Sequence, residues 1–284
     1  MKLYTTCNPH TRKRLEVLQN FYDLDTKEVE KENLYSLKNK NILFLDDGIL
    51  GFLKKMKYPD SNKYHAFHVP KYLLEYSSIQ IKIIPDITAI RLANALNKNA
   101  KNLNKFKAVP FEEKQNKFLF AGTLTGANEM QHNQRYRFCE IAAKCPRICE
   151  VNIVNRIFNE KAPDYEKNKK YLDKIEFSKK ISQQEIYSYK YIINIDGNGS
   201  RWGTISDLFS NSLMVRQDSS YNLFYEDLLK PFENYIPFSS EYFASTFASI
   251  KKFAESNPEK ISQIIDTASN LAEEIIERVN TWKI

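Results

Sequence analysis

Glycine is scarce in this chain and unevenly placed. The 284 residues hold 7 glycines, whereas average usage is about 7%. All of them fall in three short stretches: Gly48 and Gly51; Gly122 and Gly126; and Gly197, Gly199 and Gly203. Glycine permits positive φ and a close approach of backbone to a ligand. We therefore expect ligand-binding loops at these places, with ordinary tight turns as the alternative.

Long hydrophobic runs and paired cysteines are also missing. No run of about 18 apolar residues could form a transmembrane helix. The opening "MKLYTTCNPHTRKR" lacks the apolar segment of a secretory signal. The four cysteines show no CxxC spacing, which argues against a zinc site and suits a reducing compartment. We expect a cytoplasmic protein with free thiols, with a place at the inner face of the membrane left open.

Two familiar nucleotide motifs are absent as well. No segment fits GxxxxGK[ST], so P-loop NTPase chemistry is not expected. The stretch "DGNGSRWG" (196–203) comes close to GxGxxG but has one residue too many, which argues against a redox dinucleotide.

The charge of the chain is strongly positive. Its formal net charge is +7 and its pI about 9.0. This favours an anionic partner, such as a phosphorylated ligand, an acidic membrane face or a nucleic acid. The charge alone does not choose among them.

Strand-like and helix-like segments alternate along the chain, which predicts an α/β fold with parallel sheets. In the first part, 41–45 and 79–84 are expected strands, and 11–24 and 88–96 are expected helices. The polar stretch 101–116 is an expected linker.

The second part repeats the alternation and ends in a long helix. The expected strands are 117–122, 148–154, 192–195, 213–215 and 234–238. The expected helices are 135–144, 183–191 and 221–229, followed by one long amphipathic helix over 258–282. We predict an N-terminal α/β domain over 1–108 and a C-terminal Rossmann-like domain over 109–257, with helix 258–284 packing back on the first domain.

Two glycine loops carry the residues suited to bind a phosphate. In parallel α/β sheets, ligands bind beyond the carboxyl ends of the strands, where helix N-termini point. "IINIDGNGSRW" (192–202) offers glycines and Arg201, and "FLFAGTLTG" (118–126) offers threonine hydroxyls with Arg135 downstream. Two arginine-bearing loops in one domain suit a pyrophosphate, as in a nucleotide sugar. Transfer of a sugar then needs a carboxylate base, and Asp46 and Asp47 follow a strand in the other domain.

Three segments resemble one family of glycosyltransferases. "SNSLMVRQDSSYNLFYEDLLKPFENYIPF" (210–238), together with the preceding "DGNGSRW", is similar to the lipopolysaccharide-modifying glycosyltransferases related to Rumi-type protein O-glucosyltransferases. "FLFAGTLTG…NQRYRF" (118–138) is similar to that family's "FRGxxTG…R" segment. "ILFLDDG" (42–48) looks like its strand that ends in the catalytic aspartate.

The resemblance implies two Rossmann-like domains facing across a cleft, the GT-B architecture, and a UDP-sugar donor. It also implies inversion at the anomeric carbon and no metal or other cofactor. Asp47 would be the base, with Asp46 as its rival. The donor would be bound by residues of both loops and of the segment after the next strand: Gly122, Thr123, Thr125, Arg135, Gly199, Ser200, Arg201, Asp218 and Ser219. Asp218 and Ser219 are read first as a helix N-cap that could also touch the ribose.

We therefore expect a hexosyltransferase that moves glucose or galactose from a UDP-sugar to a lipopolysaccharide or lipooligosaccharide core. The expected partners are the UDP-sugar and a lipid-linked oligosaccharide at an anionic membrane, with no nucleic acid. A protein O-glycosyltransferase or a capsule glycosyltransferase is the alternative enzyme. A basic nucleic-acid-binding protein is the alternative from another class.

Overall fold

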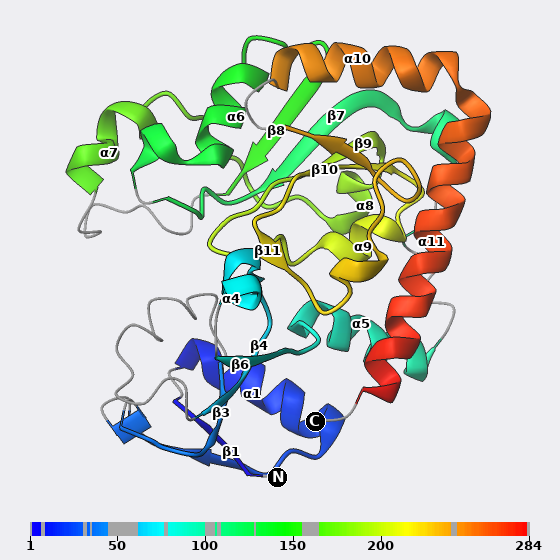
Figure 1. The fold of residues 1–284 in the computed structure, drawn as a ribbon. Helices are drawn as coiled ribbons and strands as arrows, with labels where there is room; N and C mark the ends of the chain where they lie inside the picture. The colour runs from blue at the N-terminus through cyan, green and yellow to red at the C-terminus, as the bar shows by residue number, and fades with distance from the viewer. Residues whose placement is uncertain are drawn as a thin grey trace. The chain divides into compact units, whose positions relative to one another are not determined.

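The computed structural model describes residues 2–6, 9–30, 33–34, 36–44, 62–76, 79–99, 106, 109–127, 129–154, 165–239 and 243–282. The chain divides into two compact units (Figure 1). Unit 1 consists of 1–100, 220–226 and 274–284. Unit 2 consists of 101–219 and 227–273.

Unit 1 is built on a parallel sheet in the order β2-β1-β3-β4-β6. Its strands are β1 (Leu3–Thr5), β2 (Thr26–Glu28), β3 (Asn41–Leu43), β4 (Lys63–Ala66) and β6 (Gln80–Ile83). Its helices are α1 (Pro9–Tyr22), α4 (Lys71–Tyr76) and α5 (Ile87–Lys98). Apolar side chains of β3 and β4, among them Ile42 and Tyr64, are fully buried in its core.

A later segment of the chain completes unit 1. β11 (Tyr221–Asn222) pairs antiparallel with β5 (Val69–Pro70). The sequence instead predicts a helix over 221–229, because its apolar residues recur at helical spacing. That prediction is wrong: beyond β11 only the short 3₁₀-helix η5 (Glu226–Leu228) forms. The strand pairing joins residues about 150 positions apart, so local periodicity gives no sign of it.

Unit 2 holds a second parallel sheet, in the order β12-β10-β9-β7-β8. Its strands are β7 (Gln115–Gly122), β8 (Cys149–Ile153), β9 (Tyr189–Asn194), β10 (Leu213–Gln217) and β12 (Ile236–Phe238). Its helices are α6 (Gln134–Ala142), α7 (Tyr165–Leu172), α8 (Gln183–Ile186), α9 (Thr204–Leu208) and α10 (Phe243–Ser256), with the 3₁₀-helices η3 (Phe111–Glu113) and η4 (Met130–His132).

The faces of this sheet are covered by different elements. Phe118 and Phe120 of β7 pack with α6, α10 and the first half of α11 (Pro258–Thr281). Leu119, between them in sequence, packs in a smaller cluster with Ile186 of α8. The alternation follows from the two-residue period of a strand, and it fixes which side of β7 faces the larger core.

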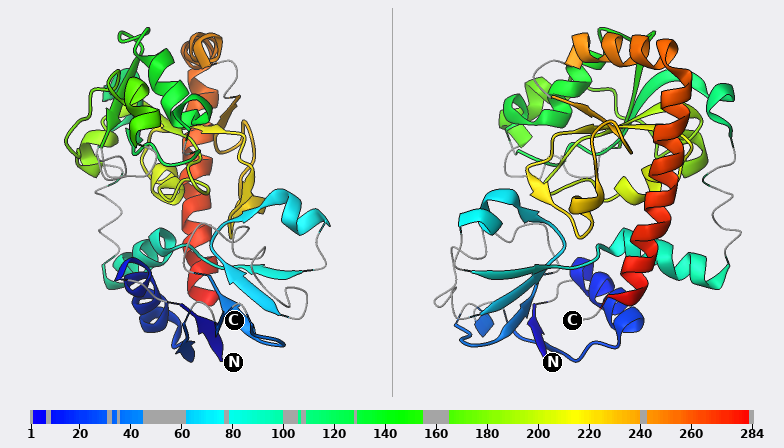
Figure 2. Two further views of the ribbon diagram at one scale, coloured as in Figure 1. Left: turned by 90° about the vertical axis from the view of Figure 1, so that its left-hand side faces the viewer. Right: turned by 45° about the vertical axis from the view of Figure 1, so that its right-hand side comes forward.

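The long C-terminal helix forms as the sequence predicts. Figure 2 shows α11 as one uninterrupted helix in both views. Pro258 occupies its first position, where the missing N–H costs nothing. Its buried side chains recur at helical spacing: Ile261, Ile264, Ile265, Ala268, Leu271, Ala272, Ile275, Ile276 and Val279. Residues 258–273 are counted with unit 2 and 274–284 with unit 1.

One predicted helix of unit 2 is much shorter than expected. Over 183–191 only α8 is helical, although it begins with a capping box between Ser182 and Glu185. Tyr187 ends the helix with ψ near 9°, and Tyr189 is already paired in the sheet opposite Gln115. The pairing of this segment in the sheet therefore outweighs its local preference for a helix.

No helix within the described residues is both long enough and apolar enough to cross a membrane.

Candidate functional site

The loops after β7 and β9 leave the unit 2 sheet at a change in strand order. From β7 the chain runs outward to β8, and it then returns to add β9 on the opposite side of β7. The crevice at such a switch point, beyond the carboxyl ends of the strands, is where open α/β sheets bind ligands. The two glycine loops singled out from the sequence are the loops at this point.

The two loops approach each other at Gly197. A Cβ placed on this residue would lie 2.9 Å from Cζ of Arg135 and closer still to Oγ1 of Thr125. Real Cβ atoms essentially never come so near another atom, so this position requires glycine. The backbone N–H of Gly126 donates to Oδ1 of Asn198 over 3.0 Å, which adds a second link between the loops.

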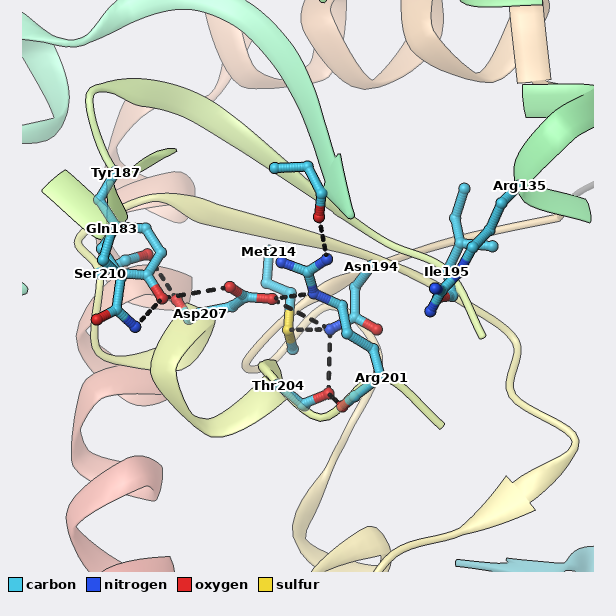
Figure 3. Close-up of polar contacts among 11 residues, drawn as sticks. Arg135, Gln183, Tyr187, Asn194, Ile195, Arg201, Thr204, Asp207, Ser210 and Met214 are labelled. Carbon is cyan, nitrogen blue, oxygen red and sulfur yellow. Dashed lines mark hydrogen bonds and ion pairs between the residues drawn. The ribbon is translucent and has the colours of Figure 1, made fainter. Parts of the chain in front are cut away.

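The guanidinium of Arg135 links the two loops, and Figure 3 shows it beside Ile195. Nη1 donates to the carbonyl of Thr123 over 3.0 Å and to Oγ1 of Thr125 over 2.6 Å. Nη2 donates to the carbonyl of Ile195 over 2.8 Å, and Nε to the carbonyls of Ile195 and Asp196. Arg135 lies in α6 and is only 8% exposed. Its hydrogen bonds thus hold the chain after β7 next to the end of β9.

The second predicted arginine, Arg201, is held in a different way. Its Nε donates to Oδ2 of Asp207 over 2.9 Å, and its Nη1 donates to the carbonyl of Ala121, near the end of β7, over 2.9 Å. The Arg201 side chain is 13% exposed and that of Asp207 is 1% exposed. The pair lies beside Thr204 and Asn194, as Figure 3 shows.

Burial and charge act in opposite directions on this pair. Burial raises the pKa of the Asp207 carboxyl, and Arg201, Asn194 and Tyr187 oppose that rise. Burial lowers the pKa of Arg201, but Asp207 outweighs this effect and the pKa is raised. Arginine is protonated at any pH a protein tolerates, so the guanidinium carries its positive charge beside Asp207.

The remaining predicted residues of unit 2 lie around the same loops. Ser200 is 1% exposed, and its Oγ finds no hydrogen-bond partner in the part of the chain that the structure describes. Gly199 is buried, and its carbonyl accepts from the N–H of Gly197 over 2.8 Å. Gly122 is the last residue of β7.

Ser219 and Asp218 do not cap a helix, because β11 follows them instead. The hydroxyl of Ser219 donates to Oδ2 of Asp196 in the β9 loop over 2.8 Å. Asp218 is exposed, and its N–H donates to the carbonyl of Phe238 over 3.2 Å. The N-cap prediction was therefore wrong, and Ser219 belongs to the loop network.

The predicted base cannot be placed. Asp46 and Asp47 lie outside the described residues, as do Gly48 and Gly51. Asp86, which follows β6, is 1% exposed and caps α5, accepting from the N–H groups of Thr88 and Ala89 over 2.8 and 2.9 Å. No group of three or more His, Cys, Asp or Glu side chains within the described ranges could hold a metal ion.

Sequence reasoning missed the polar residues that support the arginines. Asp207, Asn194 and Thr204 are nearly fully buried, yet none belongs to a recognisable motif. The available signal was weak: an acidic residue stands between the apolar residues Ile205 and Leu208. A buried carboxylate of this kind needs a cationic partner nearby.

The sequence of this chain is similar to that of a known human protein. The human protein "Protein O-glucosyltransferase 3" is 22% identical over 144 residues, which are 51% of this chain and 26% of that protein. The chain thus spans about a quarter of the length of this curated relative.

Two solved structures share the fold. The structure of HepE from Anabaena in complex with UDP-glucose aligns with a TM-score of 0.53 at 11% identity, covering 99% of this chain and 97% of that one. The N-terminal domain of Candida albicans trehalose-6-phosphate phosphatase aligns with a TM-score of 0.51 at 9% identity, covering 95% and 73%.

At such low identity these likenesses concern the fold alone, and they confirm the predicted α/β fold of the GT-B type. The family model of Glycosyl transferase family 90 matches residues 57–280, which is most of the chain. The prediction of a glycosyltransferase is confirmed at the level of the family: this chain belongs to glycosyl transferase family 90.

Proposed function

We propose that this protein is an inverting, metal-independent glycosyltransferase that moves a hexose from a UDP-sugar to a lipopolysaccharide or lipooligosaccharide core. The observation that carries the proposal is the junction of the β7 and β9 loops, which Arg135 fastens together and Arg201 borders. Family membership favours this function over nucleic-acid binding. The HepE structure, which has the same fold, was determined with UDP-glucose bound, which supports a UDP-sugar as the donor.

The loop junction suits a pyrophosphate. Backbone N–H groups of glycine loops at strand ends favour anions, and a guanidinium offers a planar fork for phosphate oxygens. In our proposal Gly122, Thr123, Thr125, Gly199, Ser200 and the two arginines surround the diphosphate. Asp218 and Ser219 border the ribose, at the end of β10. Charge that develops on the leaving UDP would be stabilised by the arginines in place of a metal.

Unit 1 would supply the base. β1 and β3 are adjacent in its sheet although β2 lies between them in sequence, so this sheet also has a switch point. Asp46 and Asp47 follow β3 in the sequence. In our mechanism Asp47 takes the proton of the acceptor hydroxyl as it attacks the anomeric carbon, the bond to UDP breaks, and the configuration inverts. Such general-base assistance contributes roughly 10²–10⁴ in rate.

Two kinds of acceptor have support. The net charge of +7 suits a phosphorylated, lipid-linked acceptor at an anionic membrane. The similarity to a human protein O-glucosyltransferase favours a second candidate, transfer to protein. The two are separated by offering a core oligosaccharide and an unfolded or folded protein substrate to the same enzyme with radiolabelled donor.

The donor site is tested by titrating UDP into the protein by calorimetry, with and without EDTA. A panel of UDP-glucose, UDP-galactose and GDP-mannose then tests slow donor hydrolysis. We expect UDP to bind equally well in EDTA and one UDP-hexose to be hydrolysed. Arg137→Ala is the matched control for Arg135→Ala, because Arg137 lies two residues further along α6 and is exposed. Loss of UDP binding in EDTA, or no binding at all, would overturn the proposal.

A further inference from the structure

Asp207 is a buried carboxylate with no assigned role. Its side chain is 1% exposed, and its Oδ2 accepts from Nε of Arg201 over 2.9 Å. It lies in the short helix α9, directly after the glycine loop that carries Arg201. Figure 3 shows the carboxylate pointing at the guanidinium.

Other side chains fix the carboxylate itself. Nδ2 of Asn194, at the end of β9, donates to Oδ2 of Asp207 over 3.3 Å and to Oγ1 of Thr204 over 3.1 Å. These two acceptors establish which end of the Asn194 amide is the nitrogen. The Tyr187 hydroxyl donates to Oδ1 of Asp207 over 3.5 Å. Asp207 is thus held from β9 and from the end of α8.

The same network holds the backbone of Arg201. Its carbonyl accepts from the Thr204 hydroxyl over 2.7 Å. Its side chain is held at two nitrogens, Nε by Asp207 and Nη1 by the carbonyl of Ala121. Within the described residues, Nη2 is the guanidinium nitrogen that these hydrogen bonds leave available for a ligand.

Orientation matters for this side chain because an unrestrained arginine has many rotamers and loses this freedom when a ligand orders it. A ligand that must order the side chain loses affinity for that reason, whereas a side chain ordered beforehand costs the ligand nothing. We propose that Asp207 is a positioning residue that orients the Arg201 guanidinium toward the donor diphosphate. This inference rests on the proposed function, in which Arg201 contacts that diphosphate.

Asp207 could instead contribute only to the stability of unit 2. The affinity for UDP distinguishes this role from a positioning role. We expect Asp207→Ala, measured on folded protein, to weaken UDP binding roughly tenfold or more, because the arginine loses its anchor. Asp207→Asn keeps the shape and an acceptor oxygen for Nε, so its Kd should stay within about threefold of the original.

The decisive measurement is a double-mutant cycle. If Asp207 acts through Arg201, then Asp207→Ala should not weaken UDP binding further in a chain that already carries Arg201→Ala. The double variant also removes both charges, so no buried charge is left without its partner. The double variant therefore remains measurable even if Asp207→Ala alone fails to fold. UDP binding can then still be compared among Asp207→Asn, Arg201→Ala and the double variant.

Lys114→Met is the control for simple destabilisation. Lys114 is 5% exposed in the same unit, and its Nζ donates to the carbonyls of Tyr187 and Ser210 and to the Ser212 hydroxyl. This variant should lower the melting temperature and leave the Kd for UDP unchanged. Equal Kd values for Asp207→Ala and the original protein, or additive losses in the double variant, would overturn the inference.

A failure of the proposed function would give a different result from a failure of the positioning role. If the unaltered protein binds no UDP, or if Arg201→Ala has no effect, the donor site is wrong. If Arg201→Ala weakens binding and Asp207→Ala does not, the donor site stands and only the positioning role is lost.

Discussion

At the scale of single residues, the molecule uses its two site arginines differently. Arg135 directs its donors at both loops, whereas Arg201 is held at Nε by Asp207 and at Nη1 by the carbonyl of Ala121. We expect Arg135→Ala to weaken UDP binding more than Arg201→Ala, because it releases both loops at once. Calorimetric Kd values for the two variants, beside Arg137→Ala, check this. A larger loss in Arg201→Ala would mean that the loops hold their places without Arg135.

Gly197 is the second residue whose replacement is informative. Alanine here would collide with Arg135 and Thr125, so we expect Gly197→Ala to weaken UDP binding by at least about tenfold. Gly203→Ala is the matched control, because its Cβ would meet nothing closer than 3.4 Å, at Nε of Arg201. Equal UDP affinity in the two variants would show that the loop junction is not needed for binding.

The predicted base is tested by separating binding from turnover. We expect Asp47→Asn to bind UDP normally and to lose transfer by roughly 10²–10⁴, since an amide cannot take the acceptor's proton. Asp46→Asn should cost much less if the side-chain alternation of the strand expected from the sequence over 41–45 continues through both aspartates. Normal turnover in Asp47→Asn together with a loss in Asp46→Asn would exchange their roles.

At the scale of elements, the burial of Lys114 next to β7 should make the stability of the protein depend on pH. Burial lowers the pKa of Lys114 to about 8 from 10.5. The unfolded chain therefore binds more protons between these values, and stability rises with pH across this window. Below about pH 8 the lysine is charged in both states and this contribution is absent.

Urea unfolding at pH 7.5, 9 and 10 measures this contribution. As pH rises, the free energy of unfolding of the original protein should increase relative to that of Lys114→Met by on the order of 1–3 kcal/mol. Lys117→Met, three residues further along the chain in β7, is the matched control. A constant difference between Lys114→Met and the original protein would contradict the prediction.

The sequence was a good guide to elements whose cause is local. β7, β9 and β10 are apolar runs, and α6 and α11 have clear helical periodicity, so each was predicted close to its place. β11 was missed because its pairing with β5 is long-range. In the same way the two arginines stand in visible motifs, whereas Asp207 does not. Whether an acidic side chain is buried depends on packing that no short stretch encodes.

At the scale of the whole molecule, the net charge of +7 predicts a salt-dependent association with anionic lipid. We expect cosedimentation with vesicles that contain phosphatidylglycerol, and progressive release as NaCl rises from about 50 to 500 mM, where the Debye length shrinks below 10 Å. Vesicles of phosphatidylcholine alone are the control. Equal binding to both, or binding that salt does not change, would remove electrostatics as the cause.

The division of the chain into units has a consequence for its biosynthesis. Unit 1 begins with residues 1–100 but also needs 220–226 and 274–284. A ribosome adds about 5–20 residues per second, so the last piece of unit 1 follows its first hundred residues by roughly 10–35 s. Until residues 221–222 are made, β5 has no β11 to pair with, and until residue 279 is made the Tyr22 hydroxyl has no Val279 carbonyl. The contacts that complete unit 1 therefore form only late in synthesis.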